Sequence, residues 1–222
     1  MSAADVIAID GPAGAGKSTV ARAVADRLGV TVLDTGAMYR AVTLACLGAG
    51  IDLQNGDACA KIGAAASIVL DDDGTVTLDG IDVTKAIRTP EVTGAVSMVS
   101  AHPQVRAIMV QHQRAWADRH STAVVEGRDI GTVVFPSARV KVFLVASDDE
   151  RAQRRLQDEQ AHGRAPTLAE LRSDIARRDA MDSDRAVSPL RPADDAVVID
   201  TTGRTIEDVV DDVLSRFEAT GS

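Results

Sequence analysis

Residues 11–18 have the composition of a loop that binds phosphate. They read Gly-Pro-Ala-Gly-Ala-Gly-Lys-Ser and match G-x-x-x-x-G-K-[ST] at every fixed position. In such a loop backbone N–H groups face the phosphates, the lysine adds charge at the β- and γ-phosphates, and the hydroxyl ligates Mg2+. A β-branched run precedes the segment and a helical pattern follows it, as the motif requires. The segment therefore predicts a site for a nucleoside triphosphate.

Two further segments suit a second, phosphorylated ligand. Val124-Val125 leads into Glu126-Gly127-Arg128-Asp129, and an arginine at the end of a buried strand suits phosphate better than a bare water. Asp34-Thr35-Gly36 leads to Arg40, so a hydroxyl and an arginine can face one cavity. A simple N-cap role for Thr35 is an equally good interpretation. A guanine-reading N-K-x-D is missing from the sequence, which argues against a GTPase switch.

Two helical stripes also carry charge. One has spacings of four, three, four and three and consists of Leu171, Ile175, Arg178, Asp182 and Arg185. These residues share one face if the helix reaches Arg185, and the change from apolar to charged indicates a polar cavity or, alternatively, solvent. The other stripe crowds three like charges, at Arg151, Arg154 and Arg155. A bound polyphosphate would relieve their repulsion, and Asp158 and Glu159 offer the alternative partners.

The overall composition excludes several classes of function. The 222 residues carry a net charge of −9, which argues against nonspecific binding to nucleic acid or to an anionic membrane. Aromatic residues make up 2%, too few for platforms that stack single-stranded bases. Cys46 and Cys59 fit no zinc or redox spacing. No signal peptide or apolar run of ~20 residues is visible, so we expect a soluble, cytoplasmic protein.

Five short apolar runs alternate with helical patterns. We expect strands at 6–9, 31–33, 123–125, 140–145 and 196–199. We expect helices at 17–28, from the Thr35-Gly36 turn to 47, and at 57–66, 91–101, 103–119, 148–160, 168–182 and 206–217. Buried strands separated by helices indicate a three-layer α/β fold with a five-stranded parallel sheet. Ligands bind at the carboxyl ends of such strands, where the candidate residues gather.

With these residues assembled, the sequence resembles bacterial cytidylate kinases, of the nucleoside monophosphate kinase class of P-loop proteins, from about Val6 to Phe217. The similar segments are 11–18, Leu-Asp-Thr-Gly-Ala-Met-Tyr-Arg at 33–40, Ile-Arg-Thr-Pro-Glu-Val at 87–92, Glu-Gly-Arg-Asp-Ile-Gly-Thr-Val-Val-Phe-Pro at 126–136, and Arg-Arg-Asp with Asp-Arg-Ala-Val-Ser-Pro-Leu between 177 and 190. The last two are highly specific to the family. Thr35 stands where many members have Ser, and Glu126 where others have Asp.

The resemblance implies the reaction ATP + (d)CMP → ADP + (d)CDP, with Mg2+, in pyrimidine nucleotide metabolism. It implies that ATP is bound by Gly11, Pro12, Ala13, Gly14, Ala15, Gly16, Lys17, Ser18, Thr19, Arg154 and Arg155, with Ser18 at the metal. It implies that Thr35, Arg40 and Arg128 hold the phosphate of CMP, that Ser97, Arg106, Asp129 and Arg185 read the cytosine, and that Arg178 and Asp182 hold the sugar. Lys17, Arg128 and Arg178 are the expected catalytic residues, and we expect Arg178 to brace Asp182.

The domain organisation follows from the same resemblance and from the sequence pattern. Ile68–Leu70 and Val76–Leu78 flank the turn at 71–74, and Asp79-Gly80 is a hairpin signal. We expect one kinase domain over 1–222, with a core at 1–62, 96–150 and 167–222. A monophosphate-binding insert with an antiparallel hairpin occupies 63–95, and a helical lid at 151–166 excludes water.

Two other functions fit part of the pattern. A small-molecule P-loop kinase of the shikimate or gluconate type shares the first motif but lacks the hairpin insert. A non-enzymatic adaptor would bind ATP without turnover. We expect ATP and CMP or dCMP as the partners, no nucleic acid or membrane, and a monomer.

Overall fold

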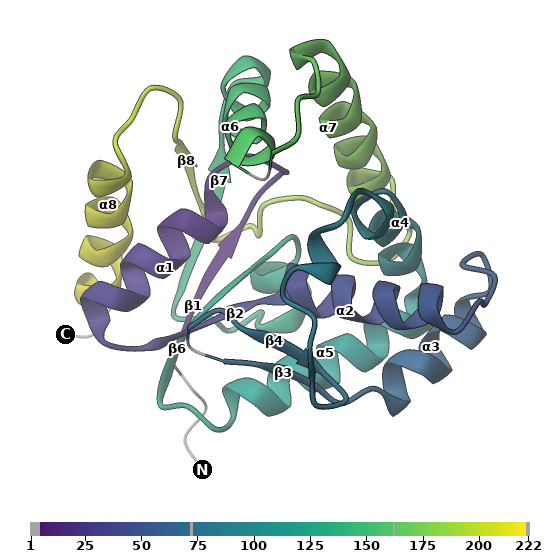
Figure 1. The fold of residues 1–222 in the computed structure, drawn as a ribbon. Helices are drawn as coiled ribbons and strands as arrows, with labels where there is room; N and C mark the ends of the chain where they lie inside the picture. The colour runs from purple at the N-terminus through teal and green to yellow at the C-terminus, as the bar shows by residue number, and fades with distance from the viewer. Residues whose placement is uncertain (1–4, 72, 162, 221–222) are drawn as a thin grey trace.

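The computed structural model describes residues 5–71, 73–161 and 163–220. Five strands form one parallel sheet in the order β2-β6-β1-β7-β8. They are β1 (Asp5–Asp10), β2 (Thr31–Asp34), β6 (Thr122–Gly127), β7 (Val140–Val145) and β8 (Val197–Asp200). The central position of β1 places the loop that follows it at the middle of the carboxyl edge (Figure 1). The predicted five-stranded parallel sheet is thus confirmed.

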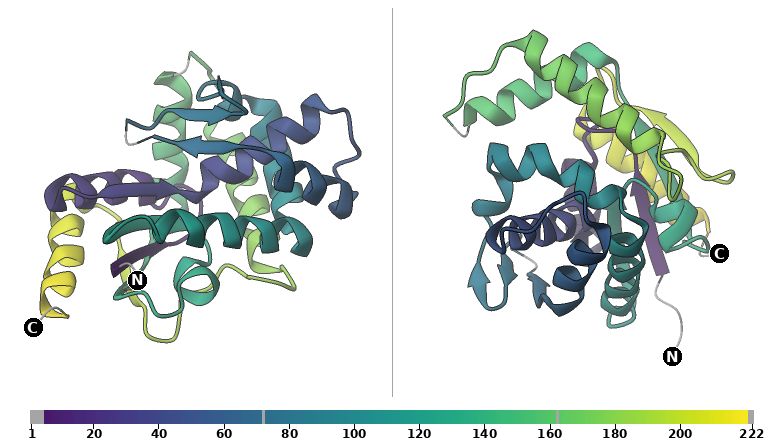
Figure 2. Two further views of the ribbon diagram at one scale, coloured as in Figure 1. Left: turned by 90° about the horizontal axis from the view of Figure 1, so that it is seen from below. Right: turned by 90° about the vertical axis from the view of Figure 1, so that its right-hand side faces the viewer.

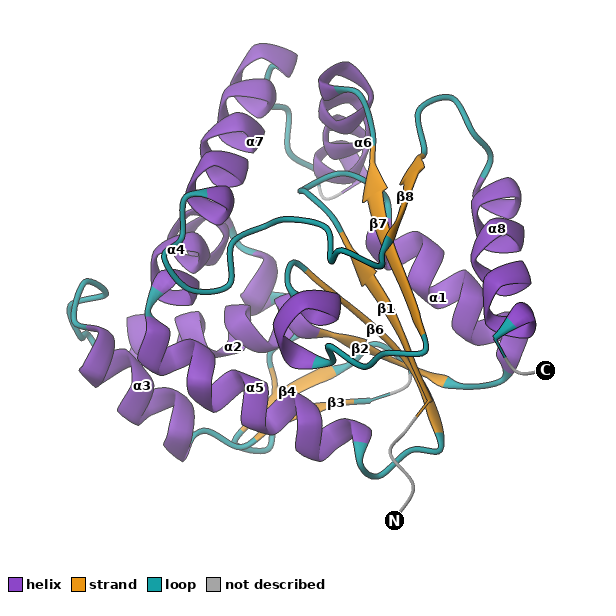
Figure 3. Ribbon diagram, turned by 180° about the vertical axis from the view of Figure 1, so that it is seen from behind, coloured by secondary structure: helices purple, strands orange, loops and turns teal. Residues whose placement is uncertain are grey.

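Helices cover both faces of this sheet because alternate side chains of each strand point to opposite sides. Ile7 and Ile9 of β1 pack with α1 (Lys17–Leu28) and α8 (Ile206–Ala219). Val6 and Ala8 face the other layer, formed by α2 (Thr35–Gly48), α3 (Gly56–Ala65), α4 (Pro90–Ala101) and α5 (Pro103–Ala117). Figure 3 shows α1 and α8 on one side of the strands and α2, α3 and α5 on the other. The expected three layers are therefore present.

A second, antiparallel sheet lies outside the main one and has three strands rather than the two of the expected hairpin. It consists of β3 (Ile68–Leu70), β4 (Val76–Leu78) and β5 (Ile81–Asp82), in that order. Asp79 and Gly80 join β4 to β5 with φ of 52° and 81°, which is the geometry of a tight two-residue turn. Val76 packs against α2 and against Ile87 of the short helix η1 (Ala86–Arg88). Asp72 of the predicted turn lies outside the described residues.

Two helices stand above the carboxyl edge of the main sheet. They are α6 (Asp148–Ala161) and α7 (Leu168–Ser183), which lie side by side in Figure 1 and in the right-hand view of Figure 2. A capping box between Thr167 and Glu170 begins α7. The helix ends at Ser183, so the predicted stripe does not extend along it to Arg185. His162 of the expected lid lies outside the described residues, and the bounds of the lid and insert stay a prediction.

One segment after β6 was not predicted. Residues Ile130–Val134 form η2, a short π-helix that directly follows Asp129. Among the described residues, no helix has both the length and the apolar character needed to cross a membrane.

We expect Gly11→Ala to destabilise the protein through a backbone clash. Gly11 has φ 148°, and a Cβ there would lie 2.2 Å from the backbone oxygen of Leu144 in β7. Separating β1 from β7 at this point should lower the free energy of unfolding by at least about 2 kcal/mol, as overpacking does. Chemical denaturation measures the loss.

Gly29→Ala is the matched control, because Gly29 also has positive φ, at 64°, but a Cβ there meets nothing within 4 Å. Backbone strain alone should cost about 1 kcal/mol at this position. Equal losses of unfolding free energy in Gly11→Ala and Gly29→Ala would show that the close approach of Leu144 does not contribute to the destabilisation.

Candidate active site

A cleft of about 1330 Å³ opens at the carboxyl ends of the parallel strands. Its lining contains every predicted site residue except Gly11 and Pro12, which lie at the start of the loop. These lining residues come from the loop after β1, from the start of α1, from α2 and α4–α7, from the segment after β6, and from Arg185 beyond α7. The fold thus brings positions as far apart as Ala13 and Arg185 to one cavity.

The loop at 11–18 is arranged to bind an anion. No side chain caps the beginning of α1 at Gly16, so its first N–H groups are available to a ligand. Lys17 crosses the loop, with its Nζ donating to the carbonyl oxygen of Pro12 at 2.7 Å. Burial, and then the positive charge of Arg128, lower the pKa of Lys17 to about 7. A negatively charged ligand would restore the charged form of this lysine.

Oxygen atoms that could bind a cation lie beside Lys17. The Ser18 hydroxyl is hydrogen-bonded to the carboxyl group of Glu126, which is buried at the end of β6. Burial and the charge of Asp34 raise the pKa of Glu126 to about 7, against the opposing effect of Lys17. Hydroxyl and carboxylate oxygens are the ligands that Mg2+ prefers. The donor set around Ser18 therefore fits this ion.

Sequence reasoning missed the connection between the loop and the helices above it. The N–H of Ala13 donates to Asp179 Oδ1 of α7 at 3.2 Å, and Arg151 of α6 donates to the carbonyl oxygen of Ala13 at 3.1 Å. Arg151 also forms an ion pair with Asp179. A carboxylate in the middle of an arginine-rich helix was a signal, but only the packing shows that it reaches the loop.

The three crowded arginines of α6 each have partners in the structure. Besides Asp179, Arg151 pairs with Asp148 at 2.5 Å, and Arg155 pairs with Glu159 at 2.6 Å, as the alternative interpretation proposed. Arg154 donates to the hydroxyl and the carbonyl of Thr201, each at 2.9 Å. Their mutual repulsion is therefore already relieved without a polyphosphate, although Arg154 and Arg155 still line the cleft.

Two arginines that line the cleft, Arg40 of α2 and Arg178 of α7, have no carboxylate in contact among the described residues. Arg40 donates to the carbonyl of Ile87 at 3.3 Å and to the hydroxyl of Thr93 at 2.8 Å. Within the described part of the chain, neither Arg40 nor Arg178 forms an ion pair with a carboxylate. Burial, and then the charge of Arg178, lower the pKa of Arg40 to about 9. Burial, and then the charge of Arg128, lower the pKa of Arg178 to about 10. Half-buried positive charge of this kind is typical of an anion site.

The N-cap interpretation of Thr35 is wrong. Asp34 caps α2 instead, by accepting the N–H of Ala37 at 2.9 Å. Thr35 is already the first helical residue, and its hydroxyl donates to the carbonyl oxygen of Glu126 at 2.7 Å. This bond joins α2 to the end of β6 and keeps the hydroxyl oxygen at the cleft.

A buried polar group closes the far end of the cleft. Asp129 Oδ2 accepts from Arg106 at 2.5 Å, and both side chains are about 95% buried or more. The guanidinium of Arg106 also lies 5.3 Å from the ring centre of Tyr39. Ser97 of α4 lines the same end. The expected residues for the base thus lie together.

The partners of Asp182 differ from the expected one. Arg128 Nε donates to Asp182 Oδ2 at 3.0 Å, and Arg185 pairs with Asp182 Oδ1. Among the described residues Arg178 forms no ion pair with this carboxylate. The charge of Asp182 nevertheless raises the pKa of Arg178, against the larger effect of burial, so the expectation that Arg178 braces Asp182 stays a prediction. The chain bends after Ser183 and returns Arg185 to Asp182.

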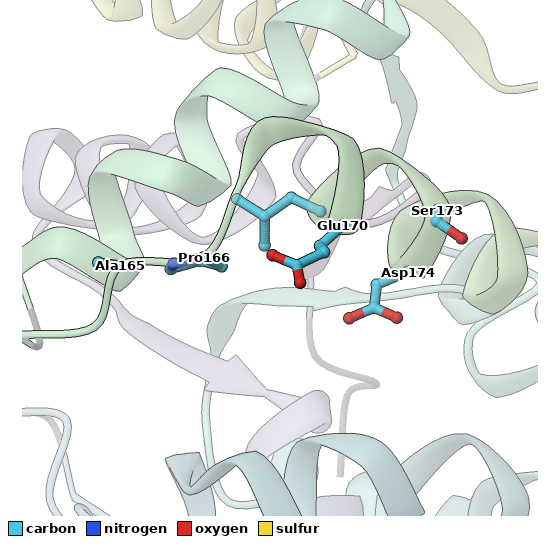
Figure 4. A pocket seen from close by; sticks show the side chains of 6 residues that line it. Ala165, Pro166, Glu170, Ser173 and Asp174 are labelled. Atoms are coloured by element: carbon cyan, nitrogen blue, oxygen red, sulfur yellow. The ribbon is translucent and has the colours of Figure 1, made fainter.

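A smaller hollow of about 600 Å³ lies at the start of α7. Figure 4 shows the carboxylates of Glu170 and Asp174 there, beside Ala165 and Pro166. Glu170 is engaged by the N–H and hydroxyl of Thr167. The lining of this hollow has no basic side chain, so it does not suit an anionic nucleotide.

We expect Lys17→Met to stabilise the ligand-free protein in a pH-dependent way. The pKa of Lys17 is about 7 in the folded protein and 10.5 when exposed, so the unfolded chain binds more protons between these values. Below about pH 7 the charged lysine therefore lowers the free energy of unfolding by the largest amount. This loss of stability becomes smaller as the pH rises and disappears toward pH 10.5. The variant should have the higher Tm near pH 6.5, with a gap that narrows by about pH 9.

Thermal unfolding across this pH range measures the gap. Lys61→Met on the exposed side of α3 is the control and should show no such trend. A Tm difference between Lys17→Met and wild type that stays constant with pH would contradict the argument from burial.

Comparison with known proteins places the chain in a family. The family model for cytidylate kinase matches residues 7–219. Cytidylate kinases of Corynebacterium efficiens and Rhodococcus opacus are 50% and 52% identical, covering 96% and 94% of this chain and 94% and 93% of theirs. A solved structure of an uncharacterized protein from Eubacterium ventriosum shares the fold, with a TM-score of 0.53 and 9% identity over 96% of this chain and 98% of that one. The chain belongs to the cytidylate kinase family of phosphotransferases.

Proposed function

We propose that this protein transfers the γ-phosphoryl group of ATP to CMP or dCMP, giving ADP and CDP or dCDP. The observation that carries the proposal concerns Arg40 and Arg178. Among the described residues neither forms an ion pair with a carboxylate, and both line the same cleft as the phosphate loop. A cleft that contains a phosphate loop and two further arginines without a carboxylate in contact suits two phosphorylated ligands. The family supports a nucleotide as the second one.

The reaction needs positioning and charge neutralisation more than covalent chemistry from the protein. The loop amides and Lys17 hold the β- and γ-phosphates of ATP. Arg40, Arg128 and Thr35 hold the phosphate of CMP, and Arg178 and Asp182 hold its sugar. The attacking oxygen of CMP is already anionic, so no general base is required.

Mg2+ would be held at the Ser18 hydroxyl, with the carboxyl group of Glu126 hydrogen-bonded behind it. When bound, the ion neutralises charge on the ATP phosphates. Lys17 and Glu126 have opposite charges and lie close enough to influence each other's pKa. Loading the site with phosphate and cation would place a complementary charge beside each of them.

Cytosine differs from uracil in offering an amino group where uracil has a carbonyl. The Asp129 carboxylate can accept from this amino group but is repelled by a carbonyl. Ser97 and Arg106 would donate to the O2 and N3 edge. Asp182, fixed by Arg128 and Arg185, would accept from a sugar hydroxyl.

The helices α6 and α7 would exclude water during transfer, with 151–166 as the lid, since water would otherwise take the phosphoryl group. The contacts of Ala13 with Arg151 and Asp179 support this role, because they tie both helices to the loop. A monomeric state and a cytoplasmic location stay predictions.

An acceptor panel tests the function. We expect ATP-dependent ADP release with CMP and dCMP, at least roughly tenfold lower kcat/KM with UMP, and essentially none with AMP, GMP, shikimate or gluconate. A coupled ADP assay makes the measurement. ADP release with shikimate or gluconate would favour the small-molecule kinase, and ATP binding without any turnover would favour the adaptor.

We expect Asp182→Ala to raise the KM for CMP by roughly tenfold or more, because it removes an acceptor and leaves Arg128 and Arg185 without their partner. The KM for ATP should stay nearly unchanged. Steady-state kinetics with each substrate varied in turn gives both values.

Asp184→Ala is the control, since this exposed carboxylate lies two residues further along and outside the cleft lining. Equal rises in the two KM values for Asp182→Ala would assign Asp182 a purely structural role.

A further inference from the structure

The short helix η2 begins in an unusual way. Asp129 occupies its N-cap position, with φ −143° and ψ 24°, yet its side chain makes no capping hydrogen bond. An aspartate in this position ordinarily accepts an N–H group from the first turn of its own helix. The N–H groups at the start of η2 must therefore be satisfied by another residue.

That residue is Asp10, the last residue of the central strand β1. Its Oδ1 accepts the N–H of Ile130 at 2.9 Å, and its Oδ2 accepts the N–H of Gly131 at 2.8 Å. Asp10 is 5% exposed and its backbone is paired with Gly127 on one side and Phe143 on the other. Both carboxylate oxygens are thus committed to η2 from a position that the main sheet holds firmly.

The opposite end of η2 is held by cationic side chains. Arg114 of α5 donates to the carbonyl oxygens of Val133 and Val134, each at 2.9 Å. Lys141 of β7 donates to the carbonyl oxygen of Pro136 at 2.5 Å. The side-chain carbons of Lys141 also pass close to the helix, since a Cβ at Gly131 would lie 3.2 Å from them. An anion at the first N–H groups and cations at the last carbonyls complement the helix dipole. Of the contacts of Asp10, Arg114 and Lys141 with this segment, only those of Asp10 involve the N–H groups that directly follow Asp129.

Because Asp10 caps η2, the carboxylate of Asp129 can turn away from its own helix. It pairs instead with Arg106 at 2.5 Å, at the buried end of the cleft. If the N–H groups of Ile130 and Gly131 lost their acceptor, Asp129 would be the nearest carboxylate in sequence to replace it. Its side chain would then leave Arg106, since one carboxylate cannot satisfy both demands.

We propose that Asp10 is a positioning residue for base recognition: by capping η2 across the sheet, it keeps the Asp129 carboxylate facing Arg106 and the base. The inference rests on the proposed function, since it takes Asp129 as the group that reads cytosine. It links the strand that carries the phosphate loop to the specificity of the other substrate site.

Two measurements on Asp10→Asn test this. Amide hydrogen exchange in the ligand-free protein should show lost protection at Ile130 or Gly131, because a carboxamide has one acceptor oxygen where the carboxylate has two. The ratio of kcat/KM for CMP to that for UMP should fall by roughly fivefold or more, with the KM for ATP within about twofold of wild type. Asp5→Asn, at the exposed start of the same strand, is the matched control and should change neither.

A double variant separates positioning from general loosening. Asp129→Asn alone should abolish most of the discrimination between CMP and UMP, and adding Asp10→Asn should reduce it no further. Asp10→Glu retains the charge near Lys17 but displaces the carboxylate, and it should also lower the ratio. It serves as the test if Asp10→Asn does not fold.

Full amide protection in the variants would overturn the capping role, and lost protection with an unchanged CMP to UMP ratio would overturn the link to the base. A further loss of discrimination in the double variant would also overturn it. Wild-type protein that uses UMP as well as CMP would refute the base recognition of the proposed function, and the inference with it. The exchange data, which need no substrate, would still distinguish the two failures.

Discussion

Buried positive charge without enough counter-charge is the feature on which the rest of this structure depends. Lys17, Arg40 and Arg178 all have lowered pKa values, and burial is the largest cause for each. In the ligand-free protein these groups oppose folding, since a buried charge loses its hydration. The phosphorylated ligands of the proposed function would supply the missing negative charge, so the same groups would favour binding. Stability and function therefore conflict at this cleft, and the surrounding contacts must offset the free energy of folding that these charges cost.

The main sheet supplies most of that support. Its central strand, β1, lies between β6 and β7, so the phosphate loop leaves the sheet beside the segment that carries Arg128 and Asp129. Parallel pairing of Asp10 with Gly127 fixes the offset between the two segments. The bond from Thr35 to the carbonyl of Glu126 adds α2, which also carries Arg40. Pairing between neighbouring strands thus fixes the phosphate loop, the 128–129 segment and α2 in position relative to one another.

The helices above the cleft are fixed at the phosphate loop as well as at the sheet. Ala13 is bonded to both Arg151 of α6 and Asp179 of α7. Gly14 allows this approach, because a Cβ there would lie 3.0 Å from the backbone oxygen of Arg151. The helix that contacts the loop through Asp179 also carries Arg178 and Asp182. One helix consequently contacts the phosphate loop and also lines the cleft through Arg178 and Asp182.

Local sequence was sufficient wherever a short segment carries its own structural information. The loop at 11–18 is specified by its glycines and by Lys17 and Ser18, and each buried strand is specified by a run of apolar residues, so the five-stranded sheet and the family could be predicted. Nearly all of the predicted site residues line the cleft, because parallel strands bring their carboxyl ends to one edge. Their individual roles stay predictions.

Tertiary structure alone decided which polar groups satisfy one another. The contacts of Asp10 with Gly131 and of Ala13 with Asp179 join residues 121 and 166 positions apart, and no local pattern encodes such a pair. Asp34 rather than Thr35 caps α2, and Arg128 and Arg185 form ion pairs with Asp182, because the backbone direction at the end of a strand or helix selects the partner. The third strand of the small sheet depends likewise on a pairing partner, since two residues are too few to specify a strand by themselves. Hydrogen-bond partners are set by proximity in the folded chain, and proximity of distant segments exists only once the layers have packed.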